Sequence, residues 1–148
     1  MTGRVFFGGH HGVCVTDLET SRDFYMQNFG FVLSGSGEIS DKPEFELKKV
    51  KLEGYGIEVE LIQPYETKKR DVLPENATLV ERLSEVGINH LAFHVDDIDC
   101  AYLELKKEGV RIVTDYNPGK SKGLFCLDPD DNLIEISQKP FDDSLYKI

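Results

Sequence analysis

The feature that most constrains this chain is a nine-residue pattern that occurs twice. Residues 10–18 (HHGVCVTDL) return at 90–98 (HLAFHVDDI), with an offset of 80 residues and no gap. Each copy is followed later in the chain by a glutamate between aliphatic residues, at Glu60 and at Glu135. Because the two copies together fill the chain, the long period predicts two copies of one supersecondary unit rather than a solenoid. Each half therefore contributes one His and one Glu in equivalent places.

Length and charge narrow the function classes. The chain has 148 residues, the size of one domain with a buried core. It carries 27 acidic against 17 basic residues, a net charge of −10, which disfavours a nucleic-acid binder. It has no apolar run that could span a membrane and no apolar stretch typical of a signal peptide. Three cysteines without C-x-x-C spacing predict reduced thiols. We therefore expect a cytoplasmic protein that binds neither nucleic acid nor membranes.

Each half has the pattern of one strand, one helix and three further strands. In the first half, Thr16 and Glu19 have the spacing of a helix capping box, and Gly30 is placed to end the helix. The first-half strands are expected near 5–16, 31–38, 44–53 and 56–63. The second half is expected to hold a strand at 88–95, a helix at 98–108, and strands near 111–116, 122–127 and 132–138, with a turn at 128–132 (DPDDN).

These patterns predict one α+β domain over residues 1–148. Module 1 is expected at about 5–63, a connector at about 64–87, module 2 at about 88–139 and a C-terminal tail at 140–148. The connector begins with polar residues and then holds a short helical pattern through Leu79, Val80 and Leu83.

Strand parity places the repeated polar residues on one face of each strand. Neighbouring side chains of a strand point to opposite sides, so Val13 and Val15 form one row and leave His10 on the other. The residues on the polar sides are His10, Cys14, Glu60, His90, His94, Cys126 and Glu135. If the two halves form one curved sheet, the repeated His and Glu side chains converge on its concave side.

Two imidazoles and two carboxylates are a suitable ligand set for a divalent zinc, nickel, cobalt, manganese or iron ion. A single His or Glu on a polar strand face is usually solvated surface. Two carboxylates gathered in a pocket without a cation would be costly. The duplicated set His10, Glu60, His90 and Glu135 is therefore predicted to form a metal site. His11 competes with His10, and the gapless alignment of the two copies selects His10.

Three further residues on the polar faces are candidates for the substrate pocket. His94 lies on the side of His90, and it fits a hydrogen-bonded wall residue equally well. Cys14 and Cys126 are the other two, and both also fit a space-filling role.

The residues from His10 through 15–18 (VTDL) to 30–31 (GF) resemble the opening of proteins of the vicinal oxygen chelate superfamily, which includes glyoxalase I. The segment 128–135 (DPDDNLIE) resembles the closing hairpin of that family, with Asp131 at a position where the family usually has Gly. The resemblance covers nearly the whole chain. It implies paired βαβββ modules in an open, curved mixed sheet around a metal, helices on the outer face, and commonly a homodimer. The ligands it implies are His10, Glu60, His90 and Glu135.

The resemblance also implies a metal-dependent lyase or isomerase that acts on a small carbonyl or thioester compound. Glyoxalase I and methylmalonyl-CoA epimerase both move a proton next to a carbonyl through a metal-stabilised enediolate. Glu135 is the preferred base and Glu60 the alternative. The connector at 78–90 resembles that of the epimerases, whereas the turn at 128–132 and the glutamate at 60 resemble glyoxalase I. Both activities stay open.

Two other functions in the superfamily are weighed against these. Extradiol dioxygenases hold iron(II) with two His and one Glu, and a fourth ligand at Glu60 argues against them. Members that sequester antibiotics without catalysis typically lack the metal ligands. Retention of the whole set in this sequence favours an enzyme over a small-molecule binding protein.

Overall fold

The computed structural model describes residues 8–34 and 40–139. The chain divides into two compact units, Met1–Arg70 and Asp71–Ile148, and each unit contains one copy of the repeated pattern. Three parts of the expected elements lie outside the described residues: 5–7 of the first strand, 35–38 of the second, and the tail at 140–148.

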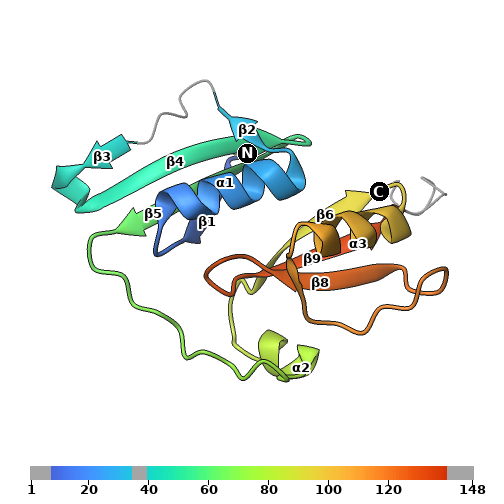
Figure 1. Ribbon diagram of the computed structural model, residues 1–148. Helices are drawn as coiled ribbons and strands as arrows, with labels where there is room; N and C mark the ends of the chain where they lie inside the picture. Colours follow the sequence, from blue (N-terminus) through green and yellow to red (C-terminus); the bar gives the residue numbers. More distant parts are fainter. Residues whose placement is uncertain (1–7, 35–39, 140–148) are drawn as a thin grey trace, which may run out of the picture. The chain divides into compact units, whose positions relative to one another are not determined.

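The first unit contains one main helix and a mixed sheet (Figure 1). Its elements are β1 (His10–Cys14), α1 (Leu18–Phe29), β2 (Val32–Leu33), β3 (Ser40–Lys42), a 3-10 turn (Pro43–Phe45), β4 (Leu47–Gly54) and β5 (Ile57–Pro64). The strand order is β1-β5-β4-β2, and β3 also pairs with β4. Only the β1–β5 pair is parallel among these described strands. The sheet is therefore open, with the first strand of the unit beside the last.

The second unit repeats this arrangement (Figure 1). Its elements are α2 (Leu79–Leu83), β6 (His90–Val95), α3 (Ile98–Lys107), β7 (Arg111–Ile112), β8 (Gly123–Leu127) and β9 (Leu133–Gln138). The strand order is β6-β9-β8-β7, with β6 and β9 parallel. The predicted α+β class, with two βαβββ modules of open mixed sheet, is confirmed.

Each main helix begins at an aspartate cap, and for α1 this cap lies one residue later than the predicted Thr16, whereas α3 begins at Ile98 as expected. Asp17, not Thr16, is the N-cap of α1, because Asp17 still has an extended backbone (φ −136°) and its carboxylate accepts a hydrogen bond from Thr20 N at 2.8 Å. That backbone hydrogen bond lowers the pKa of Asp17. In the second copy, Asp97 accepts from Cys100 N at 2.9 Å. The caps are thus duplicated along with the strands.

The core of each unit lies between its helix and one face of its sheet. In the first unit, α1 packs on β4 and β5. The buried apolar strand residues of that unit are Val13, Val50, Leu52, Val59 and Leu61. In the second unit, α3 packs on β9. Its buried strand residues include Phe93, Leu124, Cys126, Ile134 and Ile136. Because alternate strand residues are buried, the residues between them occupy the opposite face of each sheet.

A two-residue turn fixes how β4 and β5 pair. Tyr55 and Gly56 both have positive φ angles, 54° and 79°, the combination of a type I′ hairpin turn. Gly supplies this conformation readily, whereas Tyr55 adopts it at a cost. The turn sets the register that places Lys51 opposite Glu60.

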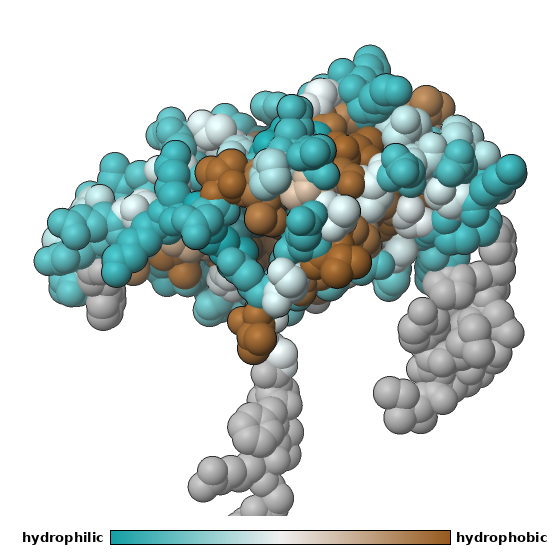
Figure 2. Space-filling view, turned by 90° about the horizontal axis from the view of Figure 1, so that it is seen from below, coloured by the Kyte–Doolittle hydropathy of each residue, from teal (hydrophilic) through white to brown (hydrophobic). Residues whose placement is uncertain are grey.

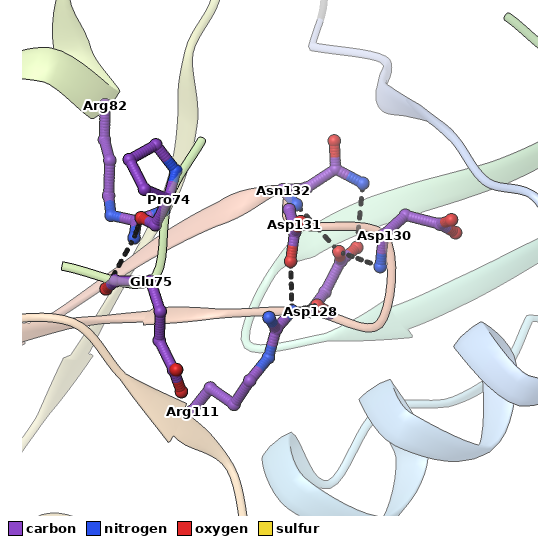
Figure 3. Close-up of polar contacts among 8 residues, drawn as sticks. All are labelled: Pro74, Glu75, Arg82, Arg111, Asp128, Asp130, Asp131 and Asn132. Carbon is purple, nitrogen blue, oxygen red and sulfur yellow. Dashed lines mark hydrogen bonds and ion pairs between the residues drawn. The ribbon is translucent and has the colours of Figure 1, made fainter. Parts of the chain in front are cut away.

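The turn between β8 and β9 is organised by Asp128 (Figure 3). Its carboxylate accepts hydrogen bonds from the backbone nitrogens of Asp130 and Asn132, at 2.9 and 2.8 Å, and from Asn132 Nδ2 at 2.9 Å. Asp131 has a left-handed backbone (φ 65°) and pairs with Arg111. Glycine adopts this conformation most readily, and aspartate is among the non-glycine residues that tolerate it.

The connector holds the predicted short helix α2, which begins with a capping box at Thr78 and Glu81. Arg82 of this helix donates hydrogen bonds to the carbonyls of Pro74 and Glu75, both at 3.3 Å (Figure 3). Several apolar side chains around it are exposed: Val72, Val80, Val86 and Ile88. Figure 2 shows apolar patches on a surface that is otherwise mostly hydrophilic. Among the described helices, none is long and apolar enough to cross a membrane.

Candidate functional site

The parallel pairing of β1 with β5 brings His10 next to Glu60. Gly12 lies directly opposite Glu60 in the register, so His10 is two residues along the same face of the sheet. His10 Nε2 lies 3.6 Å from Glu60 Oε1. Glu60 is only 6% exposed, which is unusual for a carboxylate and calls for nearby compensating charge.

The second unit repeats this relationship in the same register. Ala92 of β6 lies directly opposite Glu135 of β9, and His90 is again two residues along. His90 Nε2 lies 3.3 Å from Glu135 Oε2. The duplication seen in the sequence therefore extends to the strand register and to the contact between the two side chains.

The orientation of the His90 ring is set by Asn89. Asn89 Nδ2 donates to the carbonyl of Leu83 at 3.4 Å, which directs its Oδ1 to His90 Nδ1 at 2.6 Å. Because an amide oxygen can only accept, His90 Nδ1 is the donor of this hydrogen bond, and Nε2 is the ring nitrogen that faces the carboxylate of Glu135. A lone pair and a carboxylate that face each other repel unless a cation or proton lies between them. In metal sites in general, a ligating imidazole likewise donates its second ring nitrogen to an outer acceptor.

Lysines of β4 compensate the charge of the first-unit glutamates. Lys49 Nζ lies 3.0 Å from Glu60 Oε2, and Lys51 Nζ lies 3.0 Å from Glu58 Oε1 and 3.8 Å from Glu60 Oε2. The hydrogen bond from Lys51 to Glu58, with the charges of Glu58 and Glu60, raises the pKa of Lys51. His10 Nδ1 also lies 3.9 Å from Glu58 Oε1. The carboxylates here belong to a network of alternating charge.

The second-unit pair has a different environment. Phe125 lies opposite Glu135 in the register, and its ring contacts that of His90 edge to face, with centroids 5.6 Å apart. Within the described part of that unit, His90 is the only ion-pair partner of Glu135. The two glutamates are therefore equivalent in the fold and different in their electrostatic surroundings.

The other two histidines lie outside these pairs. His11 is opposite Val59 in the register, on the face away from Glu60, and it is exposed. The selection of His10 over His11 agrees with this placement. His94 is exposed and its Nδ1 lies 3.0 Å from Ser137 Oγ, the hydrogen-bonded wall arrangement considered from the sequence.

The two candidate pocket cysteines lie on different faces. Cys14 is exposed and shares the face of His10. Cys126 is opposite Ile134, not on the face of Glu135, and is fully buried. Burial raises the pKa of its thiol to about 12. The polar-face placement expected for Cys126 is therefore corrected: it is a core residue.

The expected ligand set is present as two pairs, one in each unit. In the described part of the chain, no three His, Cys, Asp or Glu side chains gather closely enough to hold a metal by themselves. Two ligands about 2.1 Å from one ion, at tetrahedral or octahedral angles, lie roughly 3.0 to 3.4 Å from each other. The His–Glu separations of 3.6 and 3.3 Å are close to this range. Each pair thus suits two positions of a first-row metal.

Sequence reasoning missed Lys49, Lys51 and Asn89. The signal for the lysines was present, because an alternating K-x-K and an alternating E-x-E flank the turn at Tyr55 and Gly56. Asn89 had no comparable signal, because its role depends on the position of the Leu83 carbonyl.

Comparison with known proteins places these features in context. The sequence profile of the Glyoxalase/Bleomycin resistance protein/Dioxygenase superfamily matches residues 9–136. A lactoylglutathione lyase from Schizosaccharomyces pombe is 33% identical over 144 residues, covering 86% of this chain and 45% of the relative. The chain therefore spans less than half the length of that relative.

Solved structures share the fold. The trypanothione-dependent glyoxalase I of Leishmania major has a TM-score of 0.65 and 25% identity, with 87% of this chain and 84% of that chain covered. A mutant of the fosfomycin resistance protein FosX from Listeria monocytogenes, complexed with Mn(II) and 1S,2S-dihydroxypropylphosphonic acid, has a TM-score of 0.68 and 17% identity. Coverage in that comparison is 96% of this chain and 99% of that chain. At 17% identity, the likeness shows the fold alone.

Proposed function

The chain belongs to the Glyoxalase/Bleomycin resistance protein/Dioxygenase superfamily, and on that premise we propose that it is a metal-dependent lyase or isomerase of the glyoxalase type. Its substrate is a small carbonyl or thioester compound, and its reaction moves a proton on the carbon next to the carbonyl. The observation that carries the proposal is the duplicated His–Glu contact, which has the same strand register in both units.

We propose His10, Glu60, His90 and Glu135 as the metal ligands. A divalent ion held by these residues would supply Lewis acidity, which would stabilise negative charge on the carbonyl oxygen of the substrate. Two imidazole nitrogens and two carboxylate oxygens suit zinc, nickel, cobalt, manganese or iron.

Glu135 is the proposed base. Its side chain is about one third exposed (32%), and the residue beside it is the apolar Phe125. Glu60 is held by Lys49 and Lys51, which favours a fixed carboxylate over one that accepts a proton. The Glu135 carboxylate would take the proton from the substrate carbon and return it in the second half of the reaction.

This asymmetry favours glyoxalase chemistry over epimerisation. Moving a proton between neighbouring carbons needs one base, which takes the proton and delivers it. Inverting one carbon needs a proton acceptor on one face and a donor on the other. Because Glu135 is the one of the two proposed glutamate ligands that has no lysine contact among the described residues, the single-base reaction fits better. The name of the Schizosaccharomyces relative supports the same choice.

A solvent-exchange assay tests the proposal. The chain is reconstituted with Ni²⁺, Zn²⁺ or Co²⁺ and incubated in D₂O with methylglyoxal and glutathione, and in parallel with methylmalonyl-CoA. We expect the glutathione thioester to form in the first reaction, with its deuterium content read by NMR. Turnover of methylmalonyl-CoA alone would move the assignment to the epimerase alternative. Failure of every metal-loaded form on both substrates would contradict an enzyme of this type.

The proposed site can be completed in one chain or between two copies of a homodimer, and complementation separates these arrangements. His10→Ala and His90→Ala chains are each inactive under either arrangement. If the site lies between copies, mixing the two variants restores about a quarter of full activity, because half of the dimers are mixed and each has one intact site. If the site lies within one chain, the mixture stays inactive.

A further inference from the structure

We propose that Lys49 is a resident counter-ion of Glu60, which holds this carboxylate in place in the metal-free chain and competes with a bound ion for its charge. The inference rests on the proposed function, because it assumes that Glu60 is a metal ligand. It assigns to Lys49 the control of how tightly the metal is held.

The two oxygens of Glu60 face different partners. Oε2 lies 3.0 Å from Lys49 Nζ, whereas Oε1 lies 3.6 Å from His10 Nε2. Lys49 therefore occupies one oxygen and leaves the other on the side of the imidazole. The orientation that a ligand needs is already set by the lysine before any metal arrives.

Lys49 is the closest cation to this carboxylate among the described residues. Lys51 lies 3.8 Å from Glu60 Oε2, but its shorter contact, at 3.0 Å, is with Glu58. Glu60 is 6% exposed, so water screens its charge poorly. Removing a partner of a charge in such surroundings is costly, because the remaining charge is left without compensation. Lys49 thus stabilises the first unit when no ion is bound.

The second unit has no equivalent of this lysine. Lys49 lies opposite Ile62, two residues after Glu60. The corresponding position in the second unit, opposite Ser137 and two residues after Glu135, is Gly123. The register likewise aligns Lys51, opposite Glu60, with Phe125, opposite Glu135. Among the described residues, Glu60 is therefore the one of the two glutamates that has a lysine contact.

Removal of the Lys49 charge has a definite sign for metal affinity. The metal-free chain loses the compensation of Glu60 and becomes less stable. The metal-bound chain loses the repulsion between the ammonium group and the ion. Both effects strengthen metal binding, and a unit charge near a divalent ion is enough to change affinity by about tenfold or more.

Calorimetric titration of the chelator-treated chain with Co²⁺ tests this inference. We expect Lys49→Met to lower the melting temperature without metal and to bind Co²⁺ about tenfold more tightly than the unaltered chain. Lys49→Arg, which keeps the charge, should behave like the unaltered chain. Lys48→Met is the matched control: Lys48 is exposed on the same strand, alternates with Lys49 in direction and carries the same charge. It should change neither quantity.

The outcomes separate the two proposals. If the unaltered chain binds Co²⁺ and Lys49→Met binds it with equal or lower affinity, the counter-ion role is overturned and the proposed function stands. Tighter binding in Lys48→Met as well would also overturn it, since the effect would then be one of net charge. Absence of Co²⁺ binding by the unaltered chain and by every variant would overturn both proposals.

Discussion

The side-chain oxygen of Asn89 lies 2.6 Å from Nδ1 of His90, so the imidazole presents its other nitrogen to Glu135. This contact links the end of the connector to the first residue of β6. Asn89 is not itself a proposed ligand, but it orients the ring of His90, which is one.

Replacing Asn89 should weaken metal binding without abolishing it. In Asn89→Ala the His90 ring loses the acceptor that fixes its tautomer. Outer partners of metal ligands typically contribute about 10- to 100-fold to metal affinity, so we expect the metal affinity to fall by that factor. Co²⁺ titration measures it. Asn89→Asp keeps an acceptor oxygen and should bind at least as tightly as the unaltered chain. Equal affinities of Asn89→Ala and the unaltered chain would mean that the contact does not orient the ligand.

Glu135→Gln should nearly abolish turnover and preserve the fold. General-base catalysis contributes roughly 10²- to 10⁴-fold, so the rate should fall by about that factor. Circular dichroism and the melting temperature should stay close to those of the unaltered chain, because the side chain is partly exposed. Glu85→Gln, an exposed substitution in the connector, is the control and should keep full activity. Full activity of both Glu135→Gln and Glu60→Gln would contradict the proposed mechanism.

The left-handed backbone of Asp131 predicts that two small substitutions at this position differ in stability. Asp131→Ala places a Cβ in this conformation, at a cost of about 1 kcal/mol relative to glycine, whereas Asp131→Gly removes the strain. Both variants lose the contact with Arg111, so their difference isolates the backbone. Urea unfolding should show the glycine variant to be more stable than the alanine variant by about 1 kcal/mol. Equal stabilities would show that the turn relaxes to another conformation.

The cap at Asp17 predicts a pH-dependent contribution to stability. Its pKa in the folded chain is lowered from 3.8, chiefly by the backbone hydrogen bond from Thr20. A lowered folded pKa means that the stabilisation is present above the unfolded value and is lost as the pH falls through the folded value. Asp17→Ala should therefore lower the free energy of unfolding by about 1 kcal/mol at neutral pH. The difference in the free energy of unfolding between Asp17→Ala and the unaltered chain should shrink below pH 3.8. A difference that stays constant as the pH falls through this range would argue against the cap.

Much of the fold could be predicted because the repeat and the strand alternation are local properties of the sequence. The alternation around Val13 and Val59 is enough to place His10 and Glu60 on one face, and the positions of the helices follow from Gly30 and Gly109 at their ends. The structure then supplies the parallel pairing that turns a shared face into a contact.

The remainder depends on pairing between segments. Cys126 lies on the face of Ile134 and not on the face of Glu135, because the turn at 128–132 sets the register of β8 against β9. Whether Asp17 or Thr16 is the N-cap of α1 depends on where the backbone leaves the extended region, which the capping-box spacing does not define. The role of Lys49 depends on the register across the β4–β5 hairpin.

The central proposal is that the two His–Glu pairs provide the ligands of one metal ion. Isothermal titration of the chelator-treated chain with Co²⁺, repeated on His10→Ala and His90→Ala, tests it most directly. We predict one ion per chain, and a loss of affinity of at least about tenfold in each variant, because each removes one ligand of the same ion. Absence of binding would contradict the claim. So would two ions per chain, with His10→Ala and His90→Ala each removing a different one.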